Sequence, residues 1–172
     1  MSIQLFKQYT QAMADSDWNT IASMYAEDCV SVDPDGAVFE GREANLANDQ
    51  KWASMMSDFK FNYANTVESG NVTVVEMEIT GTMTGEMPMP DGTSIPPTGK
   101  THTFKACMIM EWDQGQIKKQ RIYADFVSFM AGFGIMPGWL KTKFFHLSVM
   151  AVSYTHLRAH ETSLHLVCRL LL

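Results

Sequence analysis

The chain has 172 residues, of which 46% are hydrophobic and 19% charged, and its 13 Lys and Arg against 19 Asp and Glu give a net charge of −6. This length suits one domain, the apolar share excludes general disorder, and the acidic balance offers no basic surface to nucleic acid. No apolar run approaches the ~20 residues that span a bilayer, and the first residues lack a signal-peptide pattern. The three widely spaced cysteines indicate reduced thiols. We therefore expect a cytoplasmic protein with no membrane or nucleic-acid partner.

The sequence changes character near its C-terminal end. Residues 151–172 contain no Asp, Gly or Pro and hold three of the five histidines. His156, His160 and Glu161 have the spacing of a helical metal site, but the string VSYTHLRAHET, followed by HLVCRLLL, resembles the translation of a transposase-type sequencing adapter. We expect a domain over 1–137, an irregular extension over 138–150 and an adapter-derived tail over 151–172, the alternative being a natural helical tail.

The N-terminal part predicts helices. Apolar side chains recur at helical spacing from Ile3 to Met13 and again from Trp18 to Tyr25, and Ser16 or Asp17 can cap the second helix. A short strand, CVSVDP, closes at Pro34. A third helix is expected from Gly41 to about Met56.

The rest of the domain predicts a sheet. Four segments rich in β-branched and aromatic residues cover 59–69, 72–84, 100–112 and 116–126, with hairpin turns at 70–71 and 113–115. The polar, proline-rich stretch over 85–99 predicts a loop, and a short helix after Asp125 should stop at Gly132 and Gly134. The pattern is α+β without βαβ alternation, and no glycine-rich phosphate-binding motif occurs, so a doubly wound nucleotide-binding fold is excluded.

This order of elements resembles the cone-shaped NTF2-like fold, in which about three N-terminal helices pack on a strongly curved antiparallel sheet. The runs IASMYAEDCVSVDP, FEGREA, ITGTMTGEM, IPPTGK and IKKQRIYADFVSF are similar to SnoaL-like polyketide cyclases. The resemblance covers about 3–133 and implies a homodimer. Proton abstraction by a carboxylate in such a fold would require neither a metal nor an organic cofactor. The superfamily hosts many activities, so the fold alone leaves the function open.

One set of site residues follows from the similarity to ketosteroid isomerases. In those enzymes a helix tyrosine donates to a dienolate oxygen and an aspartate before a proline moves the proton. Tyr9 and Asp33 occupy the matching positions here. The third position, an acid on a sheet strand, falls on Met108, whose thioether cannot donate a hydrogen bond.

A second set follows from the polyketide cyclases, in which an aspartate near the end of the last strand is the base. Asp125, in RIYAD, has that place, and Tyr123 shares its face of the strand. His102, Phe104 and Met108 share a face of the preceding strand and are expected to line the cavity. Trp52 and Tyr25 complete the predicted substrate-binding residues.

Each of these residues also has a structural interpretation. Asp33 could only shape a turn, Tyr9 could be a core tyrosine, and Asp125 could cap the following helix. His102 could be an ordinary residue at a strand end, and Arg121 could pair with a neighbouring glutamate.

The resemblance and these residues together predict a cofactor-independent cyclase or isomerase that abstracts a proton next to the carbonyl of an apolar small molecule. An apolar cavity would raise the pKa of a carboxylate toward a useful range. The alternative is a non-catalytic NTF2-like protein that binds such a molecule in a hydrophobic pocket.

Overall fold

The N-terminal part of the chain is helical in the computed structural model, which describes residues 2–89 and 92–135. α1 spans Ser2–Asp15 and buries Phe6, Tyr9 and Met13 along one face. α2 spans Trp18–Met24, and its N-cap is Asp17, whose carboxylate accepts a hydrogen bond from the Thr20 amide. These two predicted helices and the Asp17 cap are confirmed.

The remaining elements follow the predicted order closely. They are β1 (Tyr25–Val32), β2 (Val38–Glu40), α3 (Arg42–Met55), β3 (Met56–Ser69), β4 (Val72–Met83), β5 (Met87–Pro88), β6 (Ser94–Ile95), β7 (Thr101–Asp113), β8 (Gln116–Ala124) and α4 (Phe126–Phe133). The segment expected as a loop contains the short antiparallel pair β5–β6. Gly134, at φ 76°, ends α4 in the left-handed conformation that glycine adopts without strain.

Six strands form one sheet in the order β2-β1-β8-β7-β4-β3. All neighbours are antiparallel except β1 and β8, which run parallel. This pair differs from the expected all-antiparallel sheet. A hairpin forces an antiparallel pair, whereas β1 and β8 are far apart in the chain, so their connection does not fix their direction.

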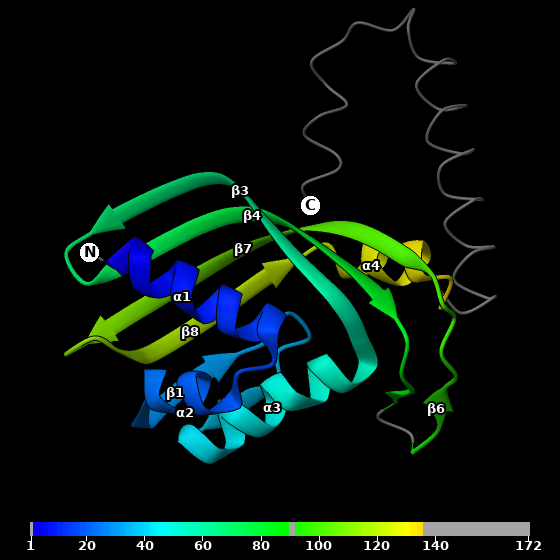
Figure 1. Ribbon diagram of the computed structural model, residues 1–172, viewed down its shortest axis with the longest axis horizontal. Coiled ribbons are helices and arrows are strands. Elements are labelled where there is room, and N and C mark those ends of the chain that lie inside the picture. The colour runs from blue at the N-terminus through cyan, green and yellow to red at the C-terminus, as the bar shows by residue number, and fades with distance from the viewer. Residues whose placement is uncertain (1, 90–91, 136–172) are drawn as a thin grey trace, which may run out of the picture. The chain divides into compact units, whose positions relative to one another are not determined.

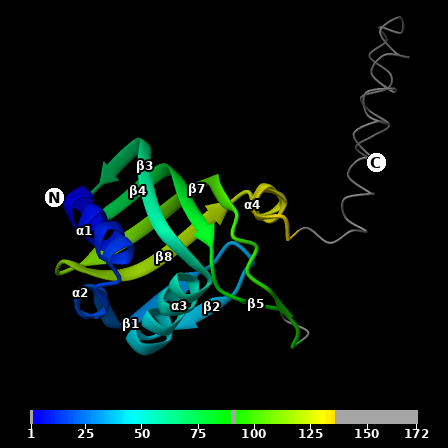
Figure 2. The same ribbon diagram turned by 45° about the vertical axis from the view of Figure 1, so that its right-hand side comes forward.

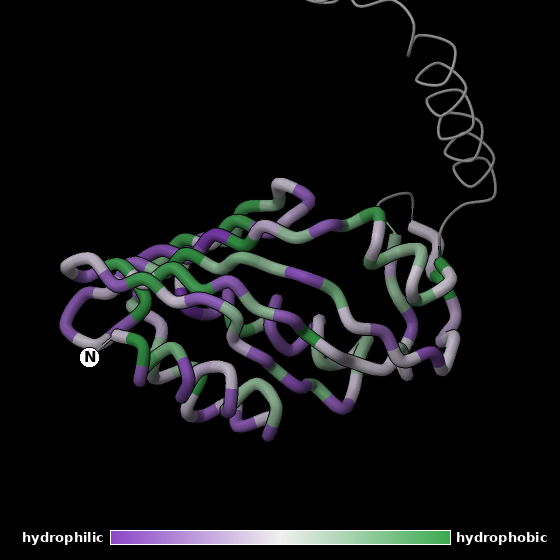
Figure 3. The backbone as a smooth tube through the Cα atoms, turned by 90° about the horizontal axis from the view of Figure 1, so that it is seen from above, coloured by the Kyte–Doolittle hydropathy of each residue, from purple (hydrophilic) through white to green (hydrophobic). Residues whose placement is uncertain are grey.

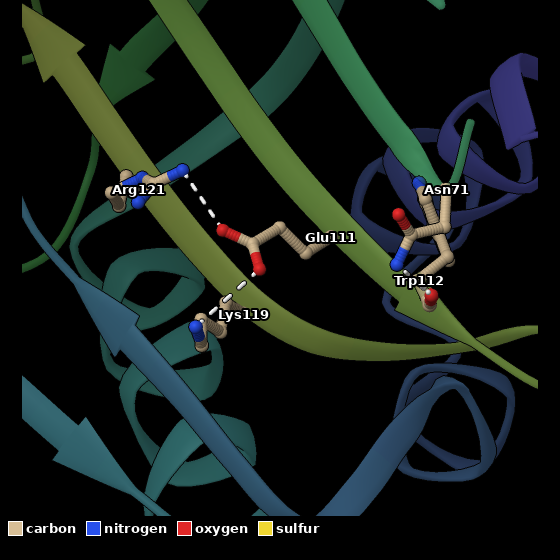
Figure 4. A network of polar contacts seen from close by, with 5 residues as sticks. All are labelled: Asn71, Glu111, Trp112, Lys119 and Arg121. Atoms are coloured by element: carbon tan, nitrogen blue, oxygen red, sulfur yellow. Dashed lines mark hydrogen bonds and ion pairs between the residues drawn. The ribbon is translucent and has the colours of Figure 1, made fainter. Parts of the chain in front are cut away.

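The two long hairpins use the predicted turns. Gly70, at φ 58°, lies between β3 and β4, while Gln114 and Gly115, at φ 48° and 85°, join β7 to β8. Near the second turn Glu111 pairs with Arg121 and Lys119, and Asn71 donates to the carbonyl of Trp112 (Figure 4). The expected pairing of Arg121 with a glutamate is therefore present.

The helices occupy two places on the sheet. Figure 1 shows α1, α2 and α3 together on one side of the curved strands, while α4 lies at the far end of β7 and β8. The turned view in Figure 2 shows the same grouping. Hydrophobic and hydrophilic positions alternate along the strands (Figure 3), as expected when only one face of a sheet is covered.

The core has two parts. One joins α1, α2 and the middle of the sheet and includes Phe6, Ile21 and Met110. The other joins the end of α3 to α4 and includes Met83 and Phe133. No helix among the described residues is long and apolar enough to cross a membrane. The expectations for 138–150 and 151–172 lie outside the described residues.

Candidate functional site

The buried face of α3 is polar. Asn45, Asn48 and Asp49 are buried, and Trp52 is partly buried on the same face, at the spacing that brings helix residues into line. A surface helix ordinarily buries apolar side chains, and buried polar groups need partners. The hydrogen-bond partners of Asn45, Asn48 and Asp49 therefore indicate what the buried polar face of α3 does.

Asn45 has a structural task. Its amide donates to the carbonyls of Gly41 and Phe39, and its side-chain oxygen accepts from the hydroxyl of Ser31. These bonds join the first turn of α3 to β1 and β2. The hydrogen bonds of Asn45 therefore help to fix the position of α3 against the sheet. They also help to fix the positions of Asn48 and Asp49, which follow on the same helix.

Asn48 and Trp52 hold the carboxylate of Asp33. The Asn48 amide donates to Asp33 Oδ2 at 3.0 Å and the Trp52 indole to the same oxygen at 3.1 Å. Asp33 is 7% exposed, and its buried Oδ1 has no hydrogen-bond partner among the described residues. The adjacent turn is closed by the backbone of Asp33, whose amide donates to the Ala37 carbonyl and whose carbonyl accepts from the Gly36 amide, and by the Asp35 side chain, which accepts from the Ala37 amide. The Asp33 side chain takes no part in these turn hydrogen bonds.

Asp49 binds two phenols. Tyr9 donates to Asp49 Oδ1 at 3.0 Å, Tyr25 donates to Oδ2 at 2.9 Å, and the two phenol oxygens are 3.2 Å apart. α1, β1 and α3 thus each supply one member of a buried cluster of three oxygen-bearing side chains. We call Tyr9, Tyr25 and Asp49 the phenol–carboxyl cluster.

Burial dominates the acid–base properties of this cluster. Desolvation raises the pKa of Asp49 to about 7, against the lowering effect of the hydrogen bonds from Tyr25 and Tyr9, and the nearby charge of Asp33 raises it further. Burial also raises the pKa of both phenols well above 10.0. Tyr9 and Tyr25 therefore keep their protons at neutral pH, while Asp49 exchanges its proton there.

A cavity of about 100 Å³ lies against the phenol–carboxyl cluster. Tyr9 and Asp49 form part of its wall, as do Pro34, which follows Asp33, and Trp52, which binds Asp33. Apart from Thr10, the rest of the wall is apolar and includes five phenylalanines: Phe59, Phe61, Phe104, Phe126 and Phe129. The described wall contains no Lys, Arg or His. Within the described residues no group of His, Cys, Asp and Glu is arranged to hold a metal ion.

The chain that forms this fold and cavity matches a known family. A family model for SnoaL-like polyketide cyclases matches residues 3–132. The chain belongs to this family. A search of curated proteins finds no match.

Solved structures support the NTF2-like fold of this SnoaL-like chain. TsrD from Streptomyces laurentii is 21% identical with a TM-score of 0.65, over 78% of this chain and 96% of that one. IdmH from Streptomyces antibioticus, a candidate polyketide cyclase, is 19% identical with a TM-score of 0.63, over 76% and 96%. A protein of ketosteroid isomerase-like fold from Catenulispora acidiphila, in complex with trimethylamine, is 16% identical with a TM-score of 0.64, over 77% and 93%. Identities this low establish the fold alone.

Asp125 and Tyr123 do not face the cavity. Ile122 and Ala124 line it, and because successive strand residues point to opposite faces, Tyr123 lies on the outer face, where it is 58% exposed. Asp125 is exposed and caps α4 by accepting from the Ser128 amide at 2.9 Å. The expectation that both residues point inward is corrected, because the apolar side chains of Ile122 and Ala124 take the covered face of β8.

His102 also lies outside the cavity wall. It shares the predicted face with Phe104 and Met108, and both of those residues line the cavity as expected. His102 instead packs edge-on against Phe133, 5.5 Å between ring centres, and lies so close under Gly132 that a Cβ there would meet its ring at 2.2 Å. α4 therefore covers the end of β7 that carries His102.

The sequence predictions and the structure overlap in part. Tyr9 and Trp52 line the cavity, Asp33 lies beside it, and Tyr25 stands behind it as a partner of Asp49. Asp49 was not predicted. The signal that could have found it is the run of polar residues at helical spacing in a helix with few large apolar residues to bury, which are Leu46, Trp52 and Met55.

Proposed function

We propose that this chain is a cofactor-independent enzyme that abstracts a proton next to the carbonyl group of an apolar compound, with Asp33 as the base and Tyr9 as the donor to the developing enolate oxygen. The observation that carries this proposal is the carboxylate of Asp33. Both donors to it bind Oδ2, which leaves buried Oδ1 without a partner beside an apolar cavity. A buried oxygen without a partner is costly and is often explained by a functional role.

The proposed step is balanced within the site. Asp33 Oδ1 takes the proton from the carbon next to the carbonyl, the C–H electron pair forms a C=C bond, and the carbonyl π pair moves to oxygen. The Tyr9 hydroxyl donates to that oxygen as its charge develops. Return of the proton to another carbon gives an isomerase, and attack of the enolate on a second carbonyl in the same molecule gives a cyclase.

The test is hydrogen exchange in deuterated water, followed by NMR for a panel of apolar ketones that begins with cyclohexanone. Asp33→Asn should lower exchange at least about 100-fold, the usual size of a general-base contribution. Glu111→Gln removes a carboxylate with two partners on the other side of the sheet and should leave exchange unchanged. Exchange by Asp33→Asn at the wild-type rate would refute the role of Asp33.

A second candidate function is binding without catalysis. The aromatic wall and the small volume of the cavity suit a compact apolar ligand, and a structural relative holds trimethylamine. Saturable ligand binding by a wild-type chain that exchanges none of the ketones would favour this candidate.

A further inference from the structure

The phenol–carboxyl cluster contains more hydrogen-bonding oxygens than protons when Asp49 is ionised. Each phenol has one proton, and the bonds to Asp49, at 3.0 Å from Tyr9 and 2.9 Å from Tyr25, use both of them. The 3.2 Å contact between the phenol oxygens then has no proton of its own. In this state Tyr9 has nothing to donate to a molecule in the cavity.

One added proton changes this balance. Protonated Asp49 carries an O–H that donates to one of the phenols, so the cluster holds three protons. Asp49 then donates to Tyr25, and Tyr25 donates to Tyr9 across the 3.2 Å contact between the phenol oxygens. The acceptor of the Tyr9 proton is no longer a charged carboxylate, so this proton can turn from Asp49 to a stronger acceptor in the cavity that Tyr9 lines.

We propose that Asp49 is a positioning residue whose protonation decides whether Tyr9 donates a hydrogen bond into the cavity. Protonated Asp49 gives a site that binds and polarises a carbonyl oxygen, and ionised Asp49 gives a site that does not. The consequence for catalysis rests on the proposed function, because it uses Tyr9 as the donor to the enolate. The hydrogen-bonding switch itself does not require turnover.

The surroundings of Asp49 suit a switch near neutral pH. The titratable groups that face it are Tyr9 from α1, Tyr25 and Cys29 from β1, and Asp33 just after β1. No Lys, Arg or His acts on it among the described residues, so no cation holds the carboxylate ionised. Burial accordingly raises the pKa of Asp49 to about 7.

The direct test needs no ligand. Tyrosine labelled at the ring carbon that bears the hydroxyl gives one NMR signal per residue, and the Tyr9 signal is assigned as the one lost in Tyr9→Phe. In the wild type this signal should move with pH, with a midpoint near the pKa of Asp49, about 7. In Asp49→Asn it should stay constant, because the amide is neutral and supplies a donor at every pH.

The second arm follows the carbonyl of bound, carbonyl-labelled cyclohexanone. Its signal should shift toward the hydrogen-bonded value below the midpoint in the wild type, at every pH in Asp49→Asn, and at none in Tyr9→Phe. Glu111→Gln, which removes a carboxylate with two partners outside the cavity, should behave as the wild type.

The outcomes separate this inference from the proposed function. A Tyr9 signal that is constant between about pH 5 and about pH 9 in the wild type, or that still titrates in Asp49→Asn, would overturn the switch. A titrating Tyr9 signal without ketone exchange would keep the switch and reject the enzyme. Ketone exchange that falls tenfold per pH unit above the midpoint in the wild type, and does not fall in Asp49→Asn, would support both.

Discussion

At the scale of single residues, the candidate site contains two carboxylates with different environments. Asp33 accepts hydrogen bonds from the Asn48 amide and the Trp52 indole on one oxygen, whereas Asp49 is 6% exposed among apolar groups and phenols. Paired acids with such different surroundings are how many active sites separate a base from a proton-holding acid. The two residues are 16 positions apart in sequence, and only the packing of α3 on β1 brings them together.

Asp49 should also make stability depend on pH. Its pKa rises from 3.8 in the unfolded chain to about 7 in the native protein, so the native state binds an extra proton between these values. The free energy of unfolding should therefore fall as pH rises from about 4 to about 7, by at most about 4 kcal/mol, since one pKa unit corresponds to about 1.4 kcal/mol. Denaturant unfolding at several pH values measures this slope.

Asp49→Asn should remove most of that slope, because the amide does not titrate. Asp113→Asn changes an exposed aspartate at the β7–β8 turn and serves as the control, with the wild-type slope expected. An unchanged slope in Asp49→Asn would mean that burial does not raise the pKa of Asp49 as far as we state.

At the scale of elements, the strands and helices with a regular apolar period were predictable, and α3 shows where such prediction ends. The helix expected from Gly41 to about Met56 is present as α3, yet its buried face carries Asn45, Asn48 and Asp49. Periodicity identifies apolar faces, so it does not by itself distinguish a buried polar face from one that faces solvent. The family likeness pointed to Tyr9 and Asp33 but not to Asp49.

The orientation of β8 shows a second limit. Strand residues alternate between faces, so the sequence shows that Tyr123 and Asp125 share a face but not which face of the strand is covered. The cyclase likeness implied that their face was the covered one. Ile122 and Ala124 line the cavity instead, and Tyr123 is exposed.

The role of Asp125 as a helix cap has a distinct mutational signature. Asp125→Ala removes the acceptor for the Ser128 amide and should lower the free energy of unfolding by roughly 0.5–2 kcal/mol, whereas Asp125→Asn should cost only a few tenths. Thermal melts measure both changes. Ketone exchange should survive in Asp125→Asn, and its complete loss there would return Asp125 to the role of base.

At the scale of the whole molecule, the part that carries the family is self-contained. The SnoaL-like match ends at residue 132, and the chain forms a compact unit from Met1 to Ile135. α4 closes that unit with the deeply buried Phe129 and Phe133. The family likeness, which depends on the order of elements, therefore gave the architecture, while the set of residues that line the cavity depends on packing between distant elements.

The proposed origin of residues 151–172 predicts that the domain does not depend on them. A sequence translated from an adapter was never selected to pack, so a chain that ends at Met150 should melt at the same temperature as the full chain. A chain that ends at Ala124 is the control: it lacks α4 and should be strongly destabilised, since burying each large apolar side chain contributes about 1.5–3 kcal/mol. Thermal melts followed by circular dichroism compare the three chains. A loss of more than about 4 °C on ending at Met150, equivalent to about 1 kcal/mol for a domain of this size, would show that residues 151–172 stabilise the fold and would refute the adapter interpretation.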